Sequence, residues 1–185
     1  MTKKELRTQI ADEVKNLSAD YCESADAAIC RAVWESELYQ KASTMFCYIG
    51  TDREIDTKAL LLRALADGKR LALPLCVGKG IMEAREIKSL DDLVSGKFGI
   101  PAPGEQCPVV APEVFDLVIV PCSTGNEKGQ RLGYGGGFYD RYLGRTSCPK
   151  ALLCRKQLVK ADIPVEEHDL IMDYLATEDG LVKCK

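Results

Sequence analysis

The segment VFDLVIVP, residues 114–121, is almost continuously apolar. Such a strand is typical of a parallel sheet covered on both faces, because neither set of alternating side chains meets water. A glycine-rich segment, RLGYGGGFYDRYL at 131–143, follows after a short connection and leads into a predicted short helix. Together the two segments indicate an open α/β sheet with a ligand site outside the carboxyl end of a strand.

Periodic apolar spacing divides the rest of the chain into helices and strands. Asp56 is the expected N-cap of the third helix and Gly68 its stop, and the Gly- and Pro-rich stretch 91–113 predicts a long surface loop or flap. The expected elements are helices at 2–16, 18–41 and 56–68 and strands at 43–50, 69–77, 80–87, 114–121, 150–154 and 169–178. This order predicts one α/β domain over residues 1–185, with a largely parallel sheet wrapped by helices.

Length and charge exclude several classes of protein. The 185 residues, 46% hydrophobic and 29% charged, suffice for one domain with its own core. A net charge of −3 and a pI near 5.4 give no basic field for a nucleic-acid partner. No stretch reaches the roughly 20 apolar residues of a membrane span, and the N-terminus lacks an apolar signal core, so we expect a cytoplasmic protein without a membrane partner. The oligomeric state is left open, with a monomer as the expectation.

Nine cysteines are scattered along the chain without a CxxC pair. Several lie inside apolar runs such as MFCYIG at 45–50, where a free thiol behaves as a small apolar group. Because His168 is the only histidine, a His-rich metal site is excluded. Structural thiols in a reducing compartment are therefore expected, ahead of a redox or zinc role.

The glycines of 133–137 are the strongest sign of a binding site. Consecutive glycines at the start of a helix permit left-handed backbone and turn several N–H groups toward one anion. Arg131 would supply charge to a transferring phosphoryl group, and Asp140 would hold Mg²⁺ beside the phosphates. The pattern is neither GxxxxGK[ST] nor GxGxxG. The alternative is a flexible turn with Asp140 and Arg141 as a surface ion pair.

Three shorter motifs carry weaker signals. Lys3 and Arg7 stand four residues apart on a predicted helix, where they would close on an anion or form an ordinary solvated face. Glu54, after the first strand, would accept hydrogen bonds from a heterocyclic amine or amide, or serve the start of the next helix. Asp169, within EEHDLIMD at 166–173, is a second candidate metal carboxylate, or part of a charged lead-in to a strand.

The ordered set of motifs resembles the 5-formyltetrahydrofolate cyclo-ligase family, also called methenyltetrahydrofolate synthetases, over nearly the whole chain. The segments that carry the resemblance are DLVIVPCSTGNEKGQRLGYGGGFYDRYL at 116–143 and, in the family's order around it, KKELR, YIGTDREIDT, GKRLALP, IMEAREI, GIPAP and VEEHDLIMD. The resemblance implies a three-layer α/β sandwich, related to the sugar-phosphate isomerase and CoA-transferase group. It also implies ATP-dependent conversion of 5-formyltetrahydrofolate to 5,10-methenyltetrahydrofolate, with ADP and phosphate as the other products.

The same resemblance implies a nucleotide site and a metal site. Lys3 and Arg131 would act on the transferring phosphate, and Asp140 and Asp169 would be the carboxylates that hold Mg²⁺. The implied ATP-binding residues are Lys3, Lys4, Arg7, Arg131, Leu132, Gly133, Tyr134, Gly135, Gly136, Gly137, Phe138 and Tyr139.

On the folate side, Ile49 and Glu54 match family positions that line the site, with Glu54 as the hydrogen-bond partner of the pterin. Phe98 stands where an aromatic ring could lie against the pterin. The implied mechanism is attack of the formyl oxygen on the γ-phosphate of ATP, then ring closure through N10 with loss of phosphate. The protein would supply positioning and charge neutralisation, without a covalent nucleophile.

One segment departs from the family pattern. The family usually reads Pro-Gly, two small or apolar residues, Phe and Asp; this chain has PCSTGN at 121–126, with Cys122, Gly125 and Asn126 in place of Gly, Phe and Asp. We therefore expect an altered substrate-facing wall. Two alternatives stay open: an ATP-dependent ligase or kinase with a different substrate, and a non-catalytic folate binder, against which the retained cationic residues and Asp140 argue.

Overall fold

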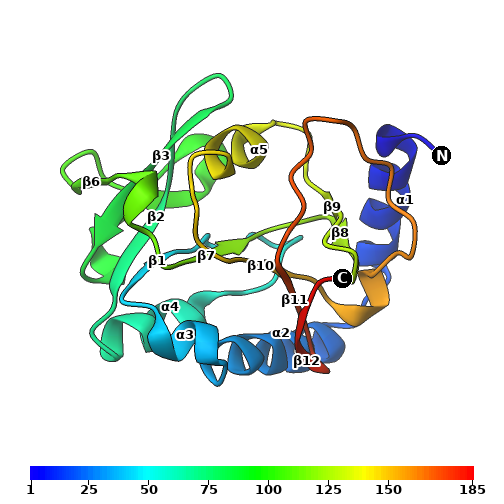
Figure 1. Ribbon diagram of the computed structural model, residues 1–185, viewed down its shortest axis with the longest axis horizontal. Coiled ribbons are helices and arrows are strands. Elements are labelled where there is room, and N and C mark those ends of the chain that lie inside the picture. The colour runs from blue at the N-terminus through cyan, green and yellow to red at the C-terminus, as the bar shows by residue number, and fades with distance from the viewer.

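The computed structural model describes the backbone of residues 1–185 and every side chain except that of Phe98, so the expectation for that ring lies outside the described residues. An eight-stranded sheet forms the middle layer, with helices on both faces (Figure 1). In spatial order its strands are β12 (Gly180–Lys183), β11 (Tyr174–Thr177), β10 (Lys150–Leu153), β7 (Leu117–Val120), β1 (Thr44–Phe46), β2 (Arg70–Gly78), β3 (Ile81–Ile87) and β6 (Val109–Val110). The run from β11 to β2 is parallel, and β12, β3 and β6 pair antiparallel. The predicted α/β class with a largely parallel sheet is confirmed; the relation to the isomerase and CoA-transferase group stays a prediction.

The helices are α1 (Lys3–Lys15), α2 (Ala19–Trp34), α3 (Glu37–Lys41), α4 (Lys58–Ala66) and α5 (Phe138–Leu143). The first three begin at Thr2, Ser18 and Ser36, whose hydroxyls accept a free backbone N–H group. The single helix expected at 18–41 is wrong, because the Ser36 hydroxyl accepts the N–H of Tyr39 and starts a separate helix there. Asp56 lies one residue before the observed N-cap, Thr57, yet its Oδ1 accepts the N–H of Lys58 at 2.9 Å. None of the described helices is long and apolar enough to cross a membrane.

The central strand β7 is buried on both faces, as its continuous apolar sequence predicts. Leu117 and Ile119 pack in the core under α2, α3 and α4, whereas Val118 and Val120 pack on the opposite face with side chains from α5. The alternation follows from the period-two geometry of a strand. The carboxyl end of β7 is thus fixed between two cores, which makes it a rigid base for the loop that follows.

The prediction of a long loop at 91–113 is wrong. This segment contains the antiparallel strands β4 (Leu93–Ser95) and β5 (Pro101–Pro103), and β6 lies near its end at the edge of the main sheet. Of the strand expected at 169–178 only β11 forms, and β12 was not expected. Elements of two to four residues are too short for a periodic apolar pattern. The remaining short turns are η1 (Leu90–Asp92), η2 (Lys97–Gly99), η3 (Pro112–Val114) and η4 (Lys156–Leu158).

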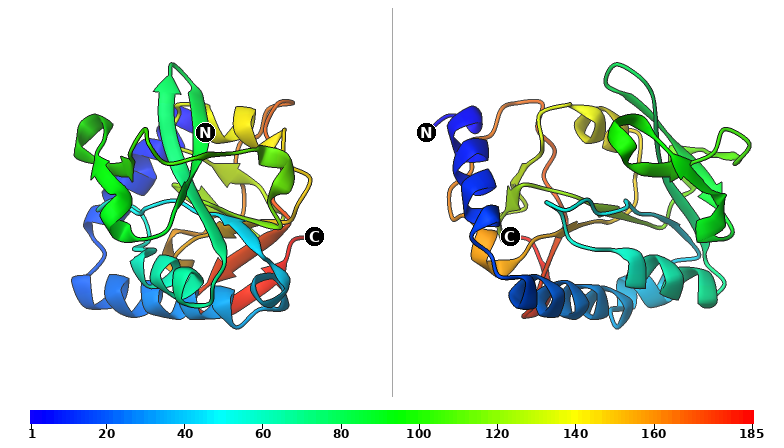
Figure 2. Two further views of the ribbon diagram at one scale, coloured as in Figure 1. Left: turned by 90° about the vertical axis from the view of Figure 1, so that its left-hand side faces the viewer. Right: turned by 180° about the vertical axis from the view of Figure 1, so that it is seen from behind.

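Three structural features frame the region beyond β7. A small hairpin, β8 (Thr124–Gly125) and β9 (Arg131–Leu132), carries the chain from β7 to the glycines. Helix α1 packs on this region because Leu6 and Ile10 form a small cluster with Leu132 and Ile163. On another side the β2–β3 hairpin projects from the sheet (Figure 2).

Candidate active site

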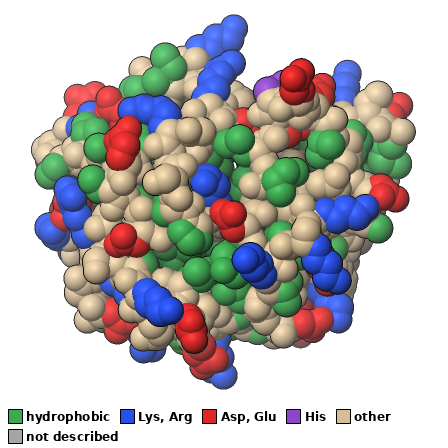
Figure 3. Space-filling view, in the orientation of Figure 1, with side chains coloured by type: hydrophobic (Ala, Val, Ile, Leu, Met, Phe, Trp, Pro, Cys, Tyr) green, Lys and Arg blue, Asp and Glu red, His purple; other side chains and the backbone are tan. Residues whose placement is uncertain are grey.

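A cavity of about 1010 Å³ opens at the carboxyl ends of the parallel strands. Tyr48 and Ile49, directly after β1, and Pro121, directly after β7, line it. This is where open α/β sheets bind ligands. Both cationic and acidic side chains line it, and charges of both signs are scattered over the face of the molecule drawn in Figure 3. The residues predicted for catalysis, ATP, metal and the folate contacts of Ile49 and Glu54 all line this one cavity.

The glycine loop, residues 133–137, forms one wall of the cavity. Gly135 and Gly137 have φ of 98° and 67°, in the region that favours glycine. Arg7 reaches across from α1, where its Nε donates to the carbonyl oxygen of Gly133 at 2.7 Å. A side chain at Gly135 would meet the Arg7 guanidinium, since its Cβ would lie 3.6 Å from Cζ. The loop and α1 therefore form a single surface, and Lys4 lies exposed beside it.

The aromatic residues of this segment fix the loop at both ends. Phe138 and Tyr139 line the cavity and also pack against the core that contains Phe46. The Tyr134 hydroxyl donates to the carbonyl oxygen of Cys122 at 2.9 Å. Leu132 is buried beneath α1. The loop is consequently attached to the sheet rather than free, which contradicts the alternative of a flexible turn.

Arg131 is buried at the floor of the cavity. Its Nη2 lies 2.7 Å from Asp140 Oδ1, so Asp140 pairs with Arg131 and not with Arg141 as a surface pair would require. The Nε–H of Arg131 is buried without an acceptor among the described residues. A buried donor without an acceptor is costly and rare in a purely structural group. Arg131 thus places a positive charge at the floor of the cavity, where its Nε–H group has no acceptor among the described residues.

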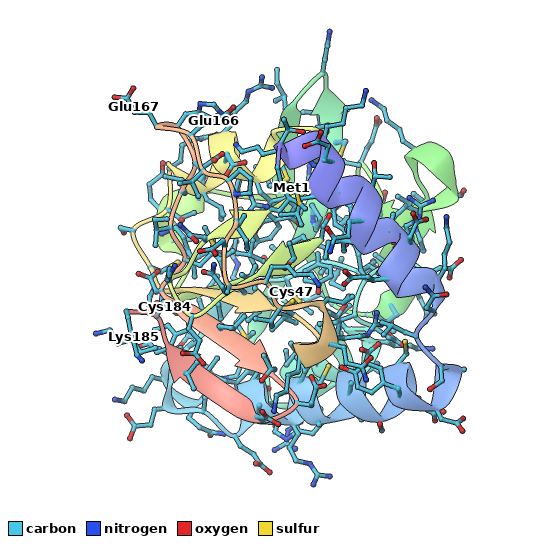
Figure 4. All side chains as sticks on the ribbon, turned by 90° about the vertical axis from the view of Figure 1, so that its right-hand side faces the viewer. Met1, Cys47, Glu166, Glu167, Cys184 and Lys185 are labelled. Atoms are coloured by element: carbon cyan, nitrogen blue, oxygen red, sulfur yellow. The ribbon has the colours of Figure 1, made fainter. Side chains whose placement is uncertain are left out.

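Lys3 lies at the mouth between two acids. Its Nζ contacts Asp169 Oδ2 at 2.5 Å and Glu166 Oε2 at 2.7 Å. Burial acts against the charge on Lys3, but the hydrogen bonds from both acids outweigh it and raise the pKa of the amine. Burial likewise opposes ionisation of Asp169, whose pKa is nevertheless lowered by the bonds from Lys3 and from the Glu166 N–H. Figure 4 shows Glu166 at the same end of the molecule as Met1 and the start of α1.

Ligand atoms that suit a cation gather at the same place. One potential ligand atom from each of Glu166, His168 and Asp169 lies within 4.8 Å of the other two. Asp140 is not one of this group, although it lines the same cavity. The two carboxylates expected to share a metal therefore belong to separate ion pairs.

A second part of the cavity lining combines apolar side chains with one acid. Ile49 and Met82 line it with Glu54, whose Oε2 accepts the N–H of Thr51 at 2.9 Å. Burial raises the pKa of Glu54, and the bonds from Thr51 only partly offset it. Glu54 does not bind the start of α4, so its alternative role as a helix-start residue is not what the structure shows.

The departure at 121–126 is not a change in the cavity wall, which corrects the sequence-based expectation. Cys122, Gly125 and Asn126 are absent from the lining, as judged over the described side chains. Gly125 is buried against Leu152, whose Cδ2 would lie 2.2 Å from a Cβ built on Gly125. Asn126 binds loop backbone, accepting the N–H groups of Lys128 and Gln130. Leu152 fills the space beside Gly125 that a larger side chain at this position would need.

This packing makes Gly125→Ala a test of this contact. We expect a loss of about 1–3 kcal/mol in the free energy of unfolding, because the new methyl group overpacks against Leu152, with kcat unchanged. Urea denaturation measures it. The matched control is Gly144→Ala, where the nearest atom to an added Cβ lies 3.8 Å away. Equal stability of the two variants would contradict the assignment.

Comparison with known proteins decides the family. A profile described as the 5-formyltetrahydrofolate cyclo-ligase family matches residues 1–178. This chain belongs to the 5-formyltetrahydrofolate cyclo-ligase family. Cyclo-ligases of known sequence and structure resemble it over most of their length, so the resemblance inferred from the motifs is confirmed.

Three of these cyclo-ligase relatives show the extent of the match. A probable 5-formyltetrahydrofolate cyclo-ligase of Schizosaccharomyces pombe is 27% identical over 99% of this chain and 98% of its own. The Escherichia coli K12 cyclo-ligase is 32% identical over 74% of this chain and 78% of its own. The NMR structure of Aquifex aeolicus 5,10-methenyltetrahydrofolate synthetase has a TM-score of 0.88 at 27% identity, covering 100% of this chain and 94% of that one.

The sequence did not reveal every residue that holds this cyclo-ligase site. Thr51 binds Glu54 through its backbone, which no side-chain motif can signal. Asp26 and Arg155 form a buried pair that lies behind the Glu54 loop. A signal for Asp26 exists: it stands in register with Ile29, Cys30 and Val33, and is an acid in the buried stripe of a helix.

Proposed function

We propose that this chain catalyses the ATP-dependent cyclisation of 5-formyltetrahydrofolate to 5,10-methenyltetrahydrofolate, with release of ADP and phosphate. One observation carries the proposal: the cation-lined glycine loop and the apolar wall with Glu54 face the same cavity of about 1010 Å³. One half suits a nucleotide triphosphate and the other a heterocycle with amide and amine groups. Membership of the cyclo-ligase family supports the same reaction.

In the proposed mechanism the protein positions two substrates that react directly with each other. The formyl oxygen attacks the γ-phosphorus as the bond to the ADP oxygen breaks, and N10 then attacks the activated formyl carbon, which releases phosphate. Backbone N–H groups of residues 133–137 would bind the phosphates, with Lys3, Lys4 and Arg7 beside them. Arg131 would neutralise charge on the transferring group. Ile49 would pack against the pterin while Glu54 accepts its N–H groups.

Mg²⁺ is part of this proposal. Oxygen ligands suit it, and it is usually held by one or two carboxylates together with substrate phosphates. We propose Asp140 and Asp169 as those carboxylates. Glu166 lies beside Asp169, with a carboxylate oxygen of each within 4.8 Å of the other. The ion would supply charge neutralisation at the phosphates. Lys3 forms an ion pair with the Asp169 carboxylate. A metal ion held by Asp169 would break that ion pair and leave the Lys3 amine to contact the nucleotide.

The near-ultraviolet absorbance of methenyltetrahydrofolate tests the proposal. We expect it to grow from 5-formyltetrahydrofolate only when ATP and Mg²⁺ are both present, to stop on chelation by EDTA, and to resume with excess Mg²⁺. No growth from a folded protein that still binds ATP would overturn the folate half. Growth in EDTA would overturn the metal assignment alone.

The alternative of a different substrate loses its basis, because it depended on an altered wall at 121–126.

A cytoplasmic location and a monomeric state belong to the proposal. The nine cysteines support a reducing compartment, since all are free thiols.

A further inference from the structure

A buried ion pair lies behind the loop that carries Glu54. Asp26 on α2 is 7% exposed, and Arg155, two residues after β10, is 4% exposed. The pair is bidentate, with Arg155 Nε 2.7 Å from Asp26 Oδ1 and Nη2 2.8 Å from Oδ2. Desolvation largely offsets the attraction between buried charges, so such a pair contributes little net stability. Its other contacts therefore matter more than the pair itself.

Both charges of the pair also bind the backbone of the Glu54 loop. Arg155 Nη2 donates to the carbonyl oxygen of Glu54 at 2.9 Å, and the N–H of Asp56 donates to Asp26 Oδ2 at 2.9 Å. These two bonds lie on either side of Ile55, which is buried. The short stretch from Glu54 to Asp56 is held from behind by two side chains that come from distant parts of the chain.

The loop is otherwise a thin wall between two cavities. Glu54 lines the large cavity and also an adjoining one of about 490 Å³, whose lining includes Asp26 and Arg155. Within the loop the backbone folds closely on itself, since a Cβ on Gly50 would lie 1.9 Å from the carbonyl oxygen of Ile55. The adjoining cavity leaves space into which this wall can retreat. The bonds from Asp26 and Arg155 oppose that movement.

We propose that Asp26 and Arg155 are positioning residues that hold the Glu54 carboxylate at the folate side of the active site. The inference rests on the proposed function, because Glu54 faces a folate only if the chain binds one. Among the described residues, no hydrogen bond of either side chain reaches the glycine loop. The hydrogen bonds of the pair therefore act on the loop that carries Glu54, and we expect the pair to govern the use of folate.

The double substitution Asp26→Leu with Arg155→Met removes both charges and puts apolar side chains in their place. Proteins often tolerate the replacement of a buried ion pair by apolar residues of similar volume without loss of stability. We expect the KM for 5-formyltetrahydrofolate to rise about tenfold, as for a modest displacement of a binding group, with the KM for ATP and the Tm unchanged. In a Glu54→Gln background the same substitutions should add nothing, because they act through Glu54. A folate KM at the wild-type value in the folded variant would overturn the proposal. Equal rises in both KM values would do the same.

Hydrogen exchange supplies a readout that does not depend on activity. In the ligand-free protein the amides of residues 51–56 should exchange about tenfold faster in the double variant, since local opening becomes easier. The matched control is Glu86→Gln, which breaks an ion pair with Arg70 outside both cavities and should leave this segment unchanged. Unchanged exchange in the double variant would overturn the positioning role. Failure of the wild-type protein to form methenyltetrahydrofolate would overturn the proposed function alone, with the exchange result still deciding the role of the pair.

Discussion

Replacing Arg131 by Lys is expected to lower kcat about a thousandfold, because a guanidinium that stabilises a transferring phosphoryl group is worth at least that factor. Arg131 is buried, bonded to Asp140 at 2.7 Å, and retains a donor without an acceptor among the described residues. Lysine keeps the charge but lacks the planar fork. It cannot bind Asp140 and face the phosphoryl group at the same time.

The measurement is kcat at saturating ATP and 5-formyltetrahydrofolate, together with the Tm of each variant. Arg141→Lys is the matched control: it makes the same change on α5, at an exposed residue outside the cavity lining, and should leave kcat unchanged. A folded Arg131→Lys enzyme with kcat near the wild-type value would contradict the catalytic role of Arg131.

Glu54→Gln should lower kcat/KM for 5-formyltetrahydrofolate by about 10- to 100-fold. Hydrogen bonds to a charged group are worth about 1.5–3 kcal/mol, and an amide offers one acceptor oxygen where the carboxylate offers two. The KM for ATP should not change, since no hydrogen bond among the described residues joins Glu54 to the glycine loop. Asp52→Asn, a nearby exposed carboxylate in the same loop, is the control. A fall in kcat/KM in both variants would contradict a specific role for Glu54.

The pH dependence follows from the direction of the Glu54 pKa. Burial raises it above the ordinary value of 4.5, so the folded protein binds this proton more tightly than the unfolded chain does. Stability contributed by this group is therefore highest below 4.5 and falls as pH rises to the raised pKa. The ionised form binds the folate, so kcat/KM for folate should decline on acidification at a pH above 4.5. Glu54→Gln should remove that decline without lowering the Tm at neutral pH.

Local sequence predicts the parts of this fold and site that depend on neighbours along the chain. The two-faced burial of β7 follows from its unbroken apolar run, and the close approach of Arg7 to the glycine loop suits residues without side chains. The residues named from motifs line one cavity because the segments after β1 and β7 open at the same edge of the parallel sheet, and α1 packs beside them.

The remaining features depend on partners that are distant in sequence. The role of Gly125 is decided by Leu152 and the position of Glu54 by Asp26 and Arg155, and no spacing rule connects these residues. The altered wall predicted at 121–126 was wrong because Gly125 is buried against Leu152 of β10 and does not face the cavity. Short strands such as β4 and β12 form because a partner lies beside them, which local periodicity cannot indicate.

The position of α1 has a consequence for how the protein is made. Lys3 binds Asp169, 166 positions further along, and Arg7 binds Gly133, 126 positions further along. Contacts at such separations cost the most loop-closure entropy and form late in folding. Helix α1 is therefore synthesised before the segments that anchor it, which lie between residues 131 and 169. A nascent chain that stops short of Asp169 has the helix but not the partner that anchors its first turn.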